Sequence, residues 1–556
     1  MSQKYLSPSQ LNGFLNCNYH RINFEKGVKK KKITFSLDAL FKRGIEHEKN
    51  YLKELKKNKK KIVIIKTIKG QEKKAAKETE RAIKEGADLI YQGCLIKDNW
   101  IGLPDFLIKV EDKNNKYHYE VTDTKISSKA KVDHIMQTSA YADFLRQYQN
   151  GILGEKIHIV LKDFKKDSFS TNETMKYFLT NKEYYENFLN SKAKDKIKPI
   201  KCSYCTFCDY QETCHEQWKK SDSINLVAGI KKAEIQLLEN NKIKTVDLLS
   251  KLDKNKEIKG VSSIRLSKLI KQAELQAVKK KTGKNKFELF QVEPFRGFNR
   301  LPKKGTCDLY FDIEGVPDFV YENGLQYLFG LTYIEKDVPK SKFFWAHNRN
   351  QEKKLIEDFL DFVWNHFKKY PDSYIFHYDD YEISTIKDLT AIHKTKIKIV
   401  DDLLRLEKFV DLFKCVKESM QMSLESYSLK DVEKFYDFKR SGNVLSASDS
   451  IDYYVEYIQT KDKKILDKIE KYNYEDLKST MQLRNWLNNQ KPENVGWFTP
   501  EKDASLTKPI EEKDWEKTGR ELDEKIQSSK IDKELKILFQ EIHQYHRREN
   551  RPDWWS

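Results

Sequence analysis

Two acidic residues and a lysine lie on neighbouring segments whose pattern predicts strands. The segments are GLPDFLIKV (residues 102–110) and YHYEVTDTKIS (117–127), and we expect them to form the two arms of a hairpin. Because side chains alternate faces along a strand, Asp123 and Lys125 share one face and point where Asp105 points. Hydrolysis of a phosphodiester uses a divalent ion, and Mg²⁺ prefers carboxylate oxygens. Lys125 is suited to orient the attacking water or to stabilise developing charge.

Helical segments on either side add further polar groups. The stretch HIMQTSAYADFL predicts a helix with Gln137 and Tyr141 four residues apart, hence on one face. The stretch FKRGIEHEKNYL places His47 on another helix. Each piece has an ordinary structural alternative, because a D-x-K strand is usually a solvated edge and a helical Gln–Tyr pair usually lies on the surface. The order of the pieces along the chain favours a catalytic role.

In that order, His, G-x-x-D, D-x-K and Q-x-x-x-Y, residues 1–218 resemble the RecB/AddB branch of the PD-(D/E)XK nucleases. The resemblance implies a restriction-endonuclease-like fold. It also implies that the metal ligands are His47, Asp105 and Asp123. The implied catalytic lysine is Lys125, and the implied helix residues that contact DNA are Gln137 and Tyr141. The sequence departs from the family in having Asp123 where Glu is commoner, and Glu120 is the nearby acid that would assist it.

Four of the eight cysteines fall in CSYCTFCDYQETC, residues 202–214. An iron-sulfur subgroup of the same family carries C-x2-C-x5-C after the nuclease core and a fourth cysteine near the N-terminus. This resemblance implies a [4Fe-4S] cluster and leaves Cys202 over; the implied ligands are Cys17, Cys205, Cys208 and Cys214. Zinc is the alternative, because the four clustered cysteines alone suffice for a tetrahedral site. The remaining cysteines are expected to be small buried side chains, namely Cys94, Cys307 and Cys415.

A second set of acids begins in CDLYFDIEGVPDF, residues 307–319. Alternation puts Asp312 and Glu314 on one face of a strand and Phe311 on the other. Tyr472 and Asp476 are one turn apart on a later helix, and between the two segments Glu382 follows a strand. Four carboxylates of this kind can hold two metal ions around one phosphate, with the tyrosine placing the attacking water. Each pattern alone is common by chance.

Together with YLFGLTY, FVDLF, YSLKDVEKFY and YNYEDLKSTMQLRNWL, these patterns resemble the YprB-type ribonuclease-H-like domain over residues 305–490. The resemblance implies DEDD 3'-5' exonuclease chemistry with Tyr472 beside the metal ligands, which are Asp312, Glu314, Glu382 and Asp476. Many DEDD enzymes have Asp where this chain has Glu382. Asp411 is a supporting candidate that we expect to be structural.

The helices and strands expected around these residues indicate an α/β multidomain protein. We expect a PD-(D/E)XK nuclease domain (1–218), a basic helical connector resembling a helix-hairpin-helix linker (219–295), a ribonuclease-H-like DEDD domain (296–490) and a charged helical tail (491–556). Such a linker would contact DNA phosphates without reading sequence, although a plain helical spacer explains it equally well. Longer relatives often continue into a superfamily 1 helicase. This chain has no G-x4-GK[ST] motif, so we expect that it does not hydrolyse ATP by itself. Because it stops where longer relatives run on toward the helicase, we expect a fragment, a stand-alone form or half of a split gene.

The composition fits a cytoplasmic protein that binds polyanions. Lys and Arg total 104 against 85 Asp and Glu, a net charge of +19, although a biased Lys-rich composition would look similar. No run approaches the roughly 18 apolar residues of a spanning helix, so no membrane association is expected. A reducing cytosol favours metal binding over disulfides for clustered cysteines.

These patterns lead to one hypothesis with two alternatives. The hypothesis is a nuclease with two active sites that uses Mg²⁺ or Mn²⁺ on DNA, on single strands or ends, in repair or processing with a helicase partner. The first alternative is an inactive nucleic-acid-binding module of a helicase complex. The second is an exonuclease that acts on RNA.

Overall fold

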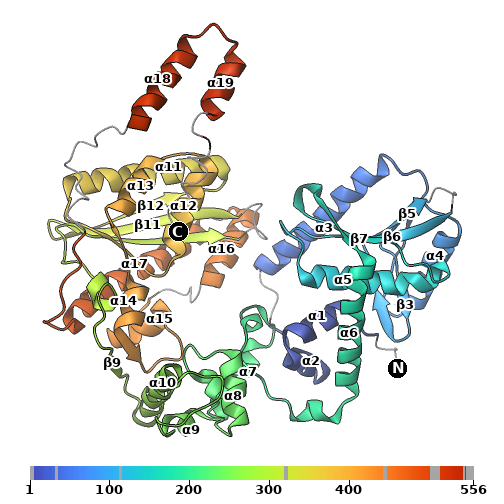
Figure 1. Ribbon diagram of the computed structural model, residues 1–556, viewed down its shortest axis with the longest axis horizontal. Coiled ribbons are helices and arrows are strands. Elements are labelled where there is room, and N and C mark those ends of the chain that lie inside the picture. The colour runs from blue at the N-terminus through green and yellow to red at the C-terminus, as the bar shows by residue number, and fades with distance from the viewer. Residues whose placement is uncertain are drawn as a thin grey trace. The chain divides into compact units, whose positions relative to one another are not determined.

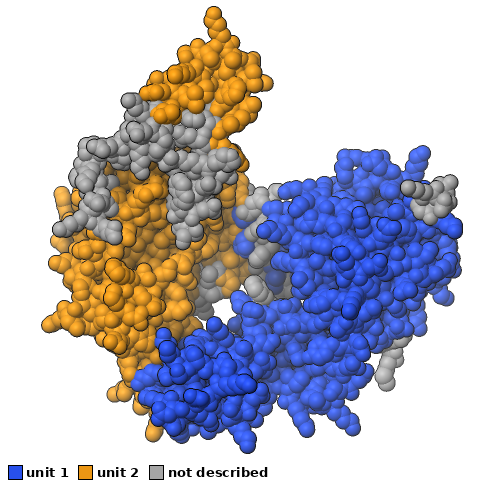
Figure 2. Space-filling model, viewed as in Figure 1, with its two compact units in different colours: residues 1–274, 317–324 blue, residues 275–316, 325–556 orange. Residues whose placement is uncertain are grey.

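The computed structural model describes residues 5–31, 35–111, 116–317, 324–441, 447–500, 514–542 and 545. The chain divides into two compact units (Figure 2). Unit 1 comprises residues 1–274 and 317–324, and unit 2 comprises 275–316 and 325–556. Both units mix helices and strands, so the predicted α/β multidomain class is confirmed.

A six-stranded mixed sheet is the centre of unit 1. Its sheet order is β1 (Ile62–Ile64), β2 (Leu89–Tyr91), β5 (Phe106–Glu111), β6 (Tyr117–Thr124), β7 (Lys156–Val160) and β8 (Lys166–Ser170). Strands β5 and β6 pair antiparallel with Leu107 opposite Val121, which confirms the predicted hairpin. Strand β7 runs parallel to β6, and helix α5 (Val132–Leu145) makes the crossover between them. A separate small ribbon joins β3 (Leu95–Lys97) to β4 (Trp100–Gly102).

Helices cover both faces of this sheet (Figure 1). Helix α3 (Phe35–Lys56) packs Tyr51 and Leu52 against Leu89 and Phe106. The opposite face, with Leu107, packs against α5 and α4 (Glu72–Lys84). The remaining helices before residue 200 are α1 (Pro8–Asn16), α2 (Asn18–Glu25), α6 (Thr171–Asn190), and the 3-10 turns η1 (Arg146–Gln149), η2 (Lys162–Phe164) and η3 (Lys192–Lys196).

Helix α1 brings the N-terminal segment to the body of unit 1. Ser7 caps the helix by accepting the N–H of Gln10, and Pro8 occupies the first turn, where no N–H is needed. The ring of Phe14 then packs within 4.9 Å of Tyr185 and 4.6 Å of Phe188 on α6. This packing fixes Cys17, the residue that ends α1.

The region predicted as a connector is helical up to residue 282. Its elements, with those just before it, are η4 (Ser203–Phe207), α7 (Gln211–Lys220), η5 (Ile224–Leu226), α8 (Lys232–Asn240), α9 (Val246–Ser250) and α10 (Ser263–Thr282). Buried side chains such as Ile235, Leu249 and Ile270 belong to the same apolar cluster as the core of unit 1. The boundary between the two units falls within α10.

Unit 2 is built on a five-stranded sheet. Its order is β12 (Val338–Trp345), β11 (Leu325–Glu335), β10 (Leu309–Val316), β13 (Ile375–His377) and β14 (Phe409–Asp411). The first three strands are antiparallel, and β13 and β14 run parallel to β10. Helices α11 (Arg349–Lys369), α12 (Tyr381–His393) and α13 (Ile397–Arg405) cover one face, and α14 (Leu412–Ser419), α16 (Ala447–Thr460) and α17 (Lys464–Gln490) lie on the other (Figure 1).

The predicted alternation of β10 is confirmed. Leu309, Phe311 and Ile313 pack toward the α11 side, whereas Tyr310 packs with the cluster on the α17 side. The other elements of unit 2 are β9 (Phe287–Leu289), η6 (Gly297–Arg300), β15 (Met420–Met422), α15 (Leu429–Val432), η7 (Glu433–Phe435), α18 (Asp514–Ser528) and α19 (Lys533–Ile542). Within the described part of the chain, no helix is both long and apolar enough to cross a membrane.

A glycine on β11 sets how closely α17 approaches the sheet. Gly330 pairs with Asp312, and a Cβ atom there would lie 1.8 Å from Oδ1 of Asn473 and 3.1 Å from Leu477. Both contacts come from α17, so even a methyl group forces the helix away.

We therefore expect Gly330→Ala to lower the free energy of unfolding by about 1–3 kcal/mol, the usual cost of overpacking. Thermal unfolding followed by circular dichroism measures this. The control is Gly44→Ala on α3, where nothing lies within 4 Å of an added Cβ and a helix-favouring residue should be neutral or stabilising. Equal stability of Gly330→Ala and wild type would contradict the close approach of α17.

Candidate metal centres

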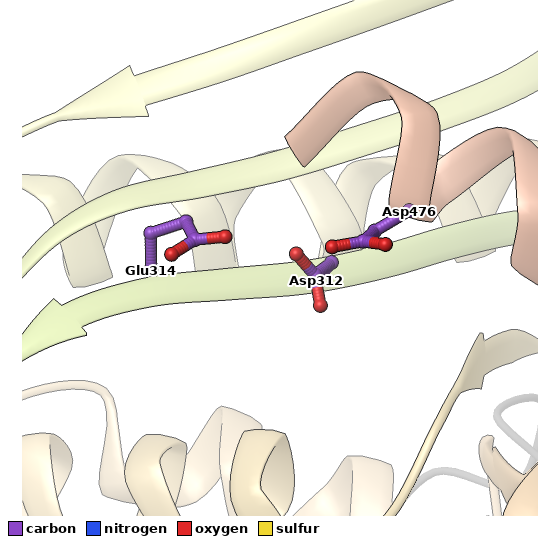
Figure 3. Close-up of side chains that lie close together, drawn as sticks. All are labelled: Asp312, Glu314 and Asp476. Atoms are coloured by element: carbon purple, nitrogen blue, oxygen red, sulfur yellow. The ribbon is translucent and has the colours of Figure 1, made fainter. Parts of the chain in front are cut away.

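Three carboxylates converge between strand β10 and helix α17. Asp312 and Glu314 project from β10, and Asp476 reaches in from α17 (Figure 3). One oxygen of each lies within 4.8 Å of the other two. Glu314 and Asp476 are buried, and Asp312 keeps some exposure. Close, buried oxygen donors of this kind fit a hard divalent cation such as Mg²⁺ or Mn²⁺.

The other two predicted residues of this set lie beside the three. Glu382, buried in the first turn of α12, is one of the charges that raise the pKa of Asp312. Its carboxylate lies 3.5 Å from Nδ1 of His377. Tyr472 lies one turn before Asp476, and Asp476, Glu314 and Asp312 all add to the burial that raises the pKa of its hydroxyl. The structure thus brings all five predicted side chains around one site.

Burial is the main influence on the protonation of these acids. It raises the pKa of Glu314 to about 8, and the nearby Asp476 adds to the shift. The pKa of Asp312 rises well above its ordinary value because burial is reinforced by the charges of Asp476, Glu314 and Glu382. Several buried carboxylates at close range repel one another unless cations compensate them.

Two cations and an amide in this site were not predicted from the sequence. Nη2 of Arg440 donates to Asp476 at 2.5 Å, and Nζ of Lys430 donates to the Tyr472 hydroxyl at 3.1 Å. Nδ2 of Asn473 donates to Asp312 at 2.6 Å. Asn473 had a usable signal, because it lies three residues before Asp476 on α17 and so on the same face of the helix. Lys430 and Arg440 come from the distant YSLKDVEKFYDFKR stretch, whose lysines and arginine resemble ordinary surface charge in sequence.

Asp411 has a structural role, as expected. Its Oδ1 accepts the N–H groups of Phe413 and Lys414 and so caps α14. The same oxygen accepts the N–H of Asp379 after β13.

Unit 1 holds a second acidic pair at the end of the β5–β6 hairpin. Oδ2 of Asp105 accepts both the N–H and the hydroxyl of Thr124 at 2.7 Å. The ammonium of Lys125 donates to Asp123, which is buried. Burial, then the charge of Asp123, raises the pKa of Asp105 well above its ordinary value. Burial alone would lower the pKa of Lys125, but the charges of Asp123 and Asp105 outweigh it and raise the pKa.

Helix α5 closes this site with the predicted Gln137–Tyr141 pair. Nε2 of Gln137 donates to the Tyr141 hydroxyl at 2.7 Å. Burial raises the pKa of Tyr141, and the charges of Asp123 and Asp105 add to it, so the hydroxyl lies near the acids. Glu120 has a different partner, because it faces His158 at 2.9 Å on the other side of the strand from Asp123.

Helix α3 carries the predicted His47 and the adjacent acid Glu48. The His47 ring stacks against Phe164 with centroids 5.4 Å apart, and its Nε2 is buried with no hydrogen-bond partner among the described residues. Glu48 is instead the α3 charge that raises the pKa of Asp105, and it accepts a hydrogen bond from Gln92. Successive helix residues point about 100° apart, so the segment IEHE alone does not decide which one faces the strands.

Five cysteines gather where α1, η4 and α7 meet. Cys17 ends α1, and its thiol interacts electrostatically with those of Cys202 and Cys208. Sγ of Cys202 lies 3.9 Å from Sγ of Cys205, so Cys202 belongs to the group and is not separate from it. Burial raises the pKa of Cys214 to about 12 and that of Cys205 to about 11. Neighbouring buried thiols provide suitable donors for a metal or an iron-sulfur cluster.

The sulfur spacing bears on which metal would fit. Zinc at a Zn–S distance of about 2.3 Å draws its four sulfurs to roughly 3.8 Å from one another. Among the described residues, no three cysteines have sulfurs that all lie within 4.8 Å of one another. The other three cysteines, Cys94, Cys307 and Cys415, are buried, as predicted.

Comparison with known proteins identifies part of unit 2. Residues 309–488 match the family model of the RNase_H superfamily. The match runs from β10 into α17 and contains all four acids of the unit 2 site, so the predicted ribonuclease-H-like domain is confirmed. No match was found among curated proteins.

The raised pKa of Glu314 makes the metal-free protein sensitive to pH. The unfolded chain ionises near the ordinary value of 4.5, whereas the folded group ionises near 8. Stability is therefore lost as the pH rises through this window.

Glu314→Gln removes this loss and should stabilise the metal-free protein at pH 8 by about 1–3 kcal/mol, with little gain near pH 5. Urea unfolding in EDTA at the two pH values measures it. Glu183→Gln, at an exposed position of α6, serves as the control and should change neither value. A Glu314→Gln protein less stable than wild type at pH 8 would contradict the assigned pKa.

Proposed function

We propose that this protein is a metal-dependent nuclease that hydrolyses phosphodiester bonds of DNA, with one active site in each unit. The convergence of Asp312, Glu314 and Asp476 within the RNase_H superfamily match carries the proposal. Bound Mg²⁺ or Mn²⁺ would activate water and neutralise the charge of the scissile phosphate.

The residues of unit 2 divide this work by position. Asp312, Glu314, Glu382 and Asp476 would hold the ions through carboxylate oxygens. The Tyr472 hydroxyl lies beside them and would orient the attacking water. The amide of Asn473 donates to one oxygen of Asp312 and would hold that carboxylate in place. This arrangement supports 3'-5' exonuclease chemistry of the DEDD type.

A PD-(D/E)XK site in unit 1 is supported by topology and by the acid pair. The succession α3, β2, β5, β6, α5, β7 gives three antiparallel strands followed by a helix and a parallel strand. Asp105 and Asp123 would hold a metal ion, and Lys125 would act on the nucleophilic water. Glu48 joins the acids from α3, where Nε2 of His47 has no hydrogen-bond partner in the described part of the chain.

The cysteine group is proposed to hold a [4Fe-4S] cluster rather than zinc. Cys17 lies beside the C-x2-C-x5-C cysteines, and no three sulfurs of the described cysteines lie within 4.8 Å of one another, as the four of a zinc site would. The cluster would join the start of unit 1 to its later helices, which is a structural role. The charge of +19 supports DNA as the partner, and a helicase would supply the single strands.

Separate loss of the two activities tests the nuclease proposal. Asp123→Asn and Asp312→Asn should each remove a different part of the Mn²⁺-dependent cleavage of end-labelled DNA, by about 100-fold or more, because each removes a carboxylate that would hold the metal ion of its site. The control is Asp358→Asn, an exposed acid on α11.

Matched single-stranded and double-stranded DNA and RNA in the same assay identify the substrate. Equal cleavage by wild type and by the double variant would refute the nuclease proposal. Salt-sensitive DNA binding without cleavage would favour the inactive binding module.

The cluster proposal predicts different results for two neighbouring cysteines. Anaerobically purified wild type should be brown with about four iron atoms per chain. Cys17→Ser should lose colour and iron, whereas Cys202→Ser should keep both. A colourless protein that contains zinc and tolerates Cys17→Ser would overturn the assignment.

A further inference from the structure

An arginine forms an ion pair with one of the carboxylates that would bind a metal ion in the unit 2 site. Nη2 of Arg440 donates to Oδ1 of Asp476 at 2.5 Å. The side chain of Arg440 is 12% exposed and that of Asp476 is 11% exposed, so the pair is largely shielded from water. A buried acid of this kind is costly when it lacks a partner, and the guanidinium here supplies the positive charge.

A second carboxylate holds the guanidinium in place. Nε of Arg440 donates to Oε2 of Glu433 at 3.0 Å, and Nη2 donates to Oε1 at 2.5 Å. The guanidinium carbon also lies 5.7 Å from the ring centroid of Tyr472. Glu433 would therefore keep Arg440 at the site even when its bond to Asp476 is broken.

One edge of the guanidinium has no partner among the residues that the structure describes. Nη1 of Arg440 is buried and makes no hydrogen bond to any described residue. The planar arginine fork fits phosphate oxygens and binds them in pairs. An unsatisfied buried N–H group beside an acidic metal site indicates a missing acceptor.

A metal ion and Arg440 compete for the carboxylate of Asp476. A divalent ion needs an oxygen of Asp476 together with one each from Asp312 and Glu314, and three such oxygens lie within 4.8 Å of one another. The guanidinium on the same carboxylate opposes the positive charge of the ion, and a phosphate group would give the guanidinium a new partner.

We propose that Arg440 is a charge-exchange residue: it neutralises Asp476 in the metal-free protein and moves to a phosphate of the nucleic acid when metal binds. The inference rests on the proposed function of this site and adds a coupling to it. Because Arg440 opposes metal and favours phosphate, nucleic acid should promote metal binding through this residue.

Metal affinity without nucleic acid gives the direct test. The experiment uses the full chain carrying Asp123→Asn, so that Mn²⁺ binding reports unit 2, and measures Mn²⁺ affinity by titration calorimetry. Adding Arg440→Gln should tighten Mn²⁺ binding about tenfold or more, because the competing cation is gone. The same change should raise the KM for a DNA oligonucleotide and slow its cleavage.

Two further variants sharpen the test. Glu433→Gln removes the carboxylate that shares Arg440, so the guanidinium should bind Asp476 more strongly and Mn²⁺ should bind more weakly. The two substitutions, at Arg440 and Glu433, should change the Mn²⁺ affinity in opposite directions. General damage to the fold would not produce this difference, so the pair of variants tests charge exchange. Arg405→Gln, at an exposed helical ion pair, is the control and should change nothing.

The outcomes distinguish this inference from the function on which it rests. Unchanged or weaker Mn²⁺ binding in a folded Arg440→Gln protein overturns charge exchange alone. Mn²⁺ binding that is absent from the Asp123→Asn parent, or that Asp312→Asn leaves intact, overturns the metal site and the inference with it.

Discussion

The close contact between helix α17 and strands β10 and β11 determines the geometry of the unit 2 site. Gly330 lets Asn473 reach Asp312, and the same turn of the helix delivers Tyr472 and Asp476. The contact forces several acids into a buried space, where their mutual repulsion must be offset by cations. The buried acids therefore attract positive charge strongly, and basic side chains of the protein supply part of that charge.

In both units a basic side chain offsets part of the negative charge of the buried acids. In unit 1 the ammonium of Lys125 donates to Asp123, and in unit 2 the guanidinium of Arg440 donates to Asp476. In each case one buried acid has a basic partner, and its neighbour carries a strongly raised pKa, Asp105 in one unit and Asp312 in the other. A basic group of this kind lowers the free energy of the metal-free state, and in our proposal it then contacts phosphate.

The local sequence pattern was sufficient to predict the strands and the face of the sheet on which each side chain lies. The alternation through Phe311 and Asp312 and the β5–β6 hairpin were predictable because a strand fixes its side chains at a period of two. Contacts between distant segments were not predictable in the same way. Asn473 and Asp312 are 161 residues apart, and Arg440 and its partner Asp476 are 36 residues apart. Glu48 shows the same limit at short range, because it and the adjacent His47 differ only in which way they point.

A divalent metal ion between β10 and α17 is the central claim of this account, and anomalous diffraction from crystals soaked in Mn²⁺ tests it most directly. The account predicts an anomalous peak within coordination distance of Asp312, Glu314 and Asp476, with Arg440 turned away from Asp476. Crystals saturated with Mn²⁺ that show no peak among these carboxylates, and an unbroken Arg440–Asp476 pair, would contradict it.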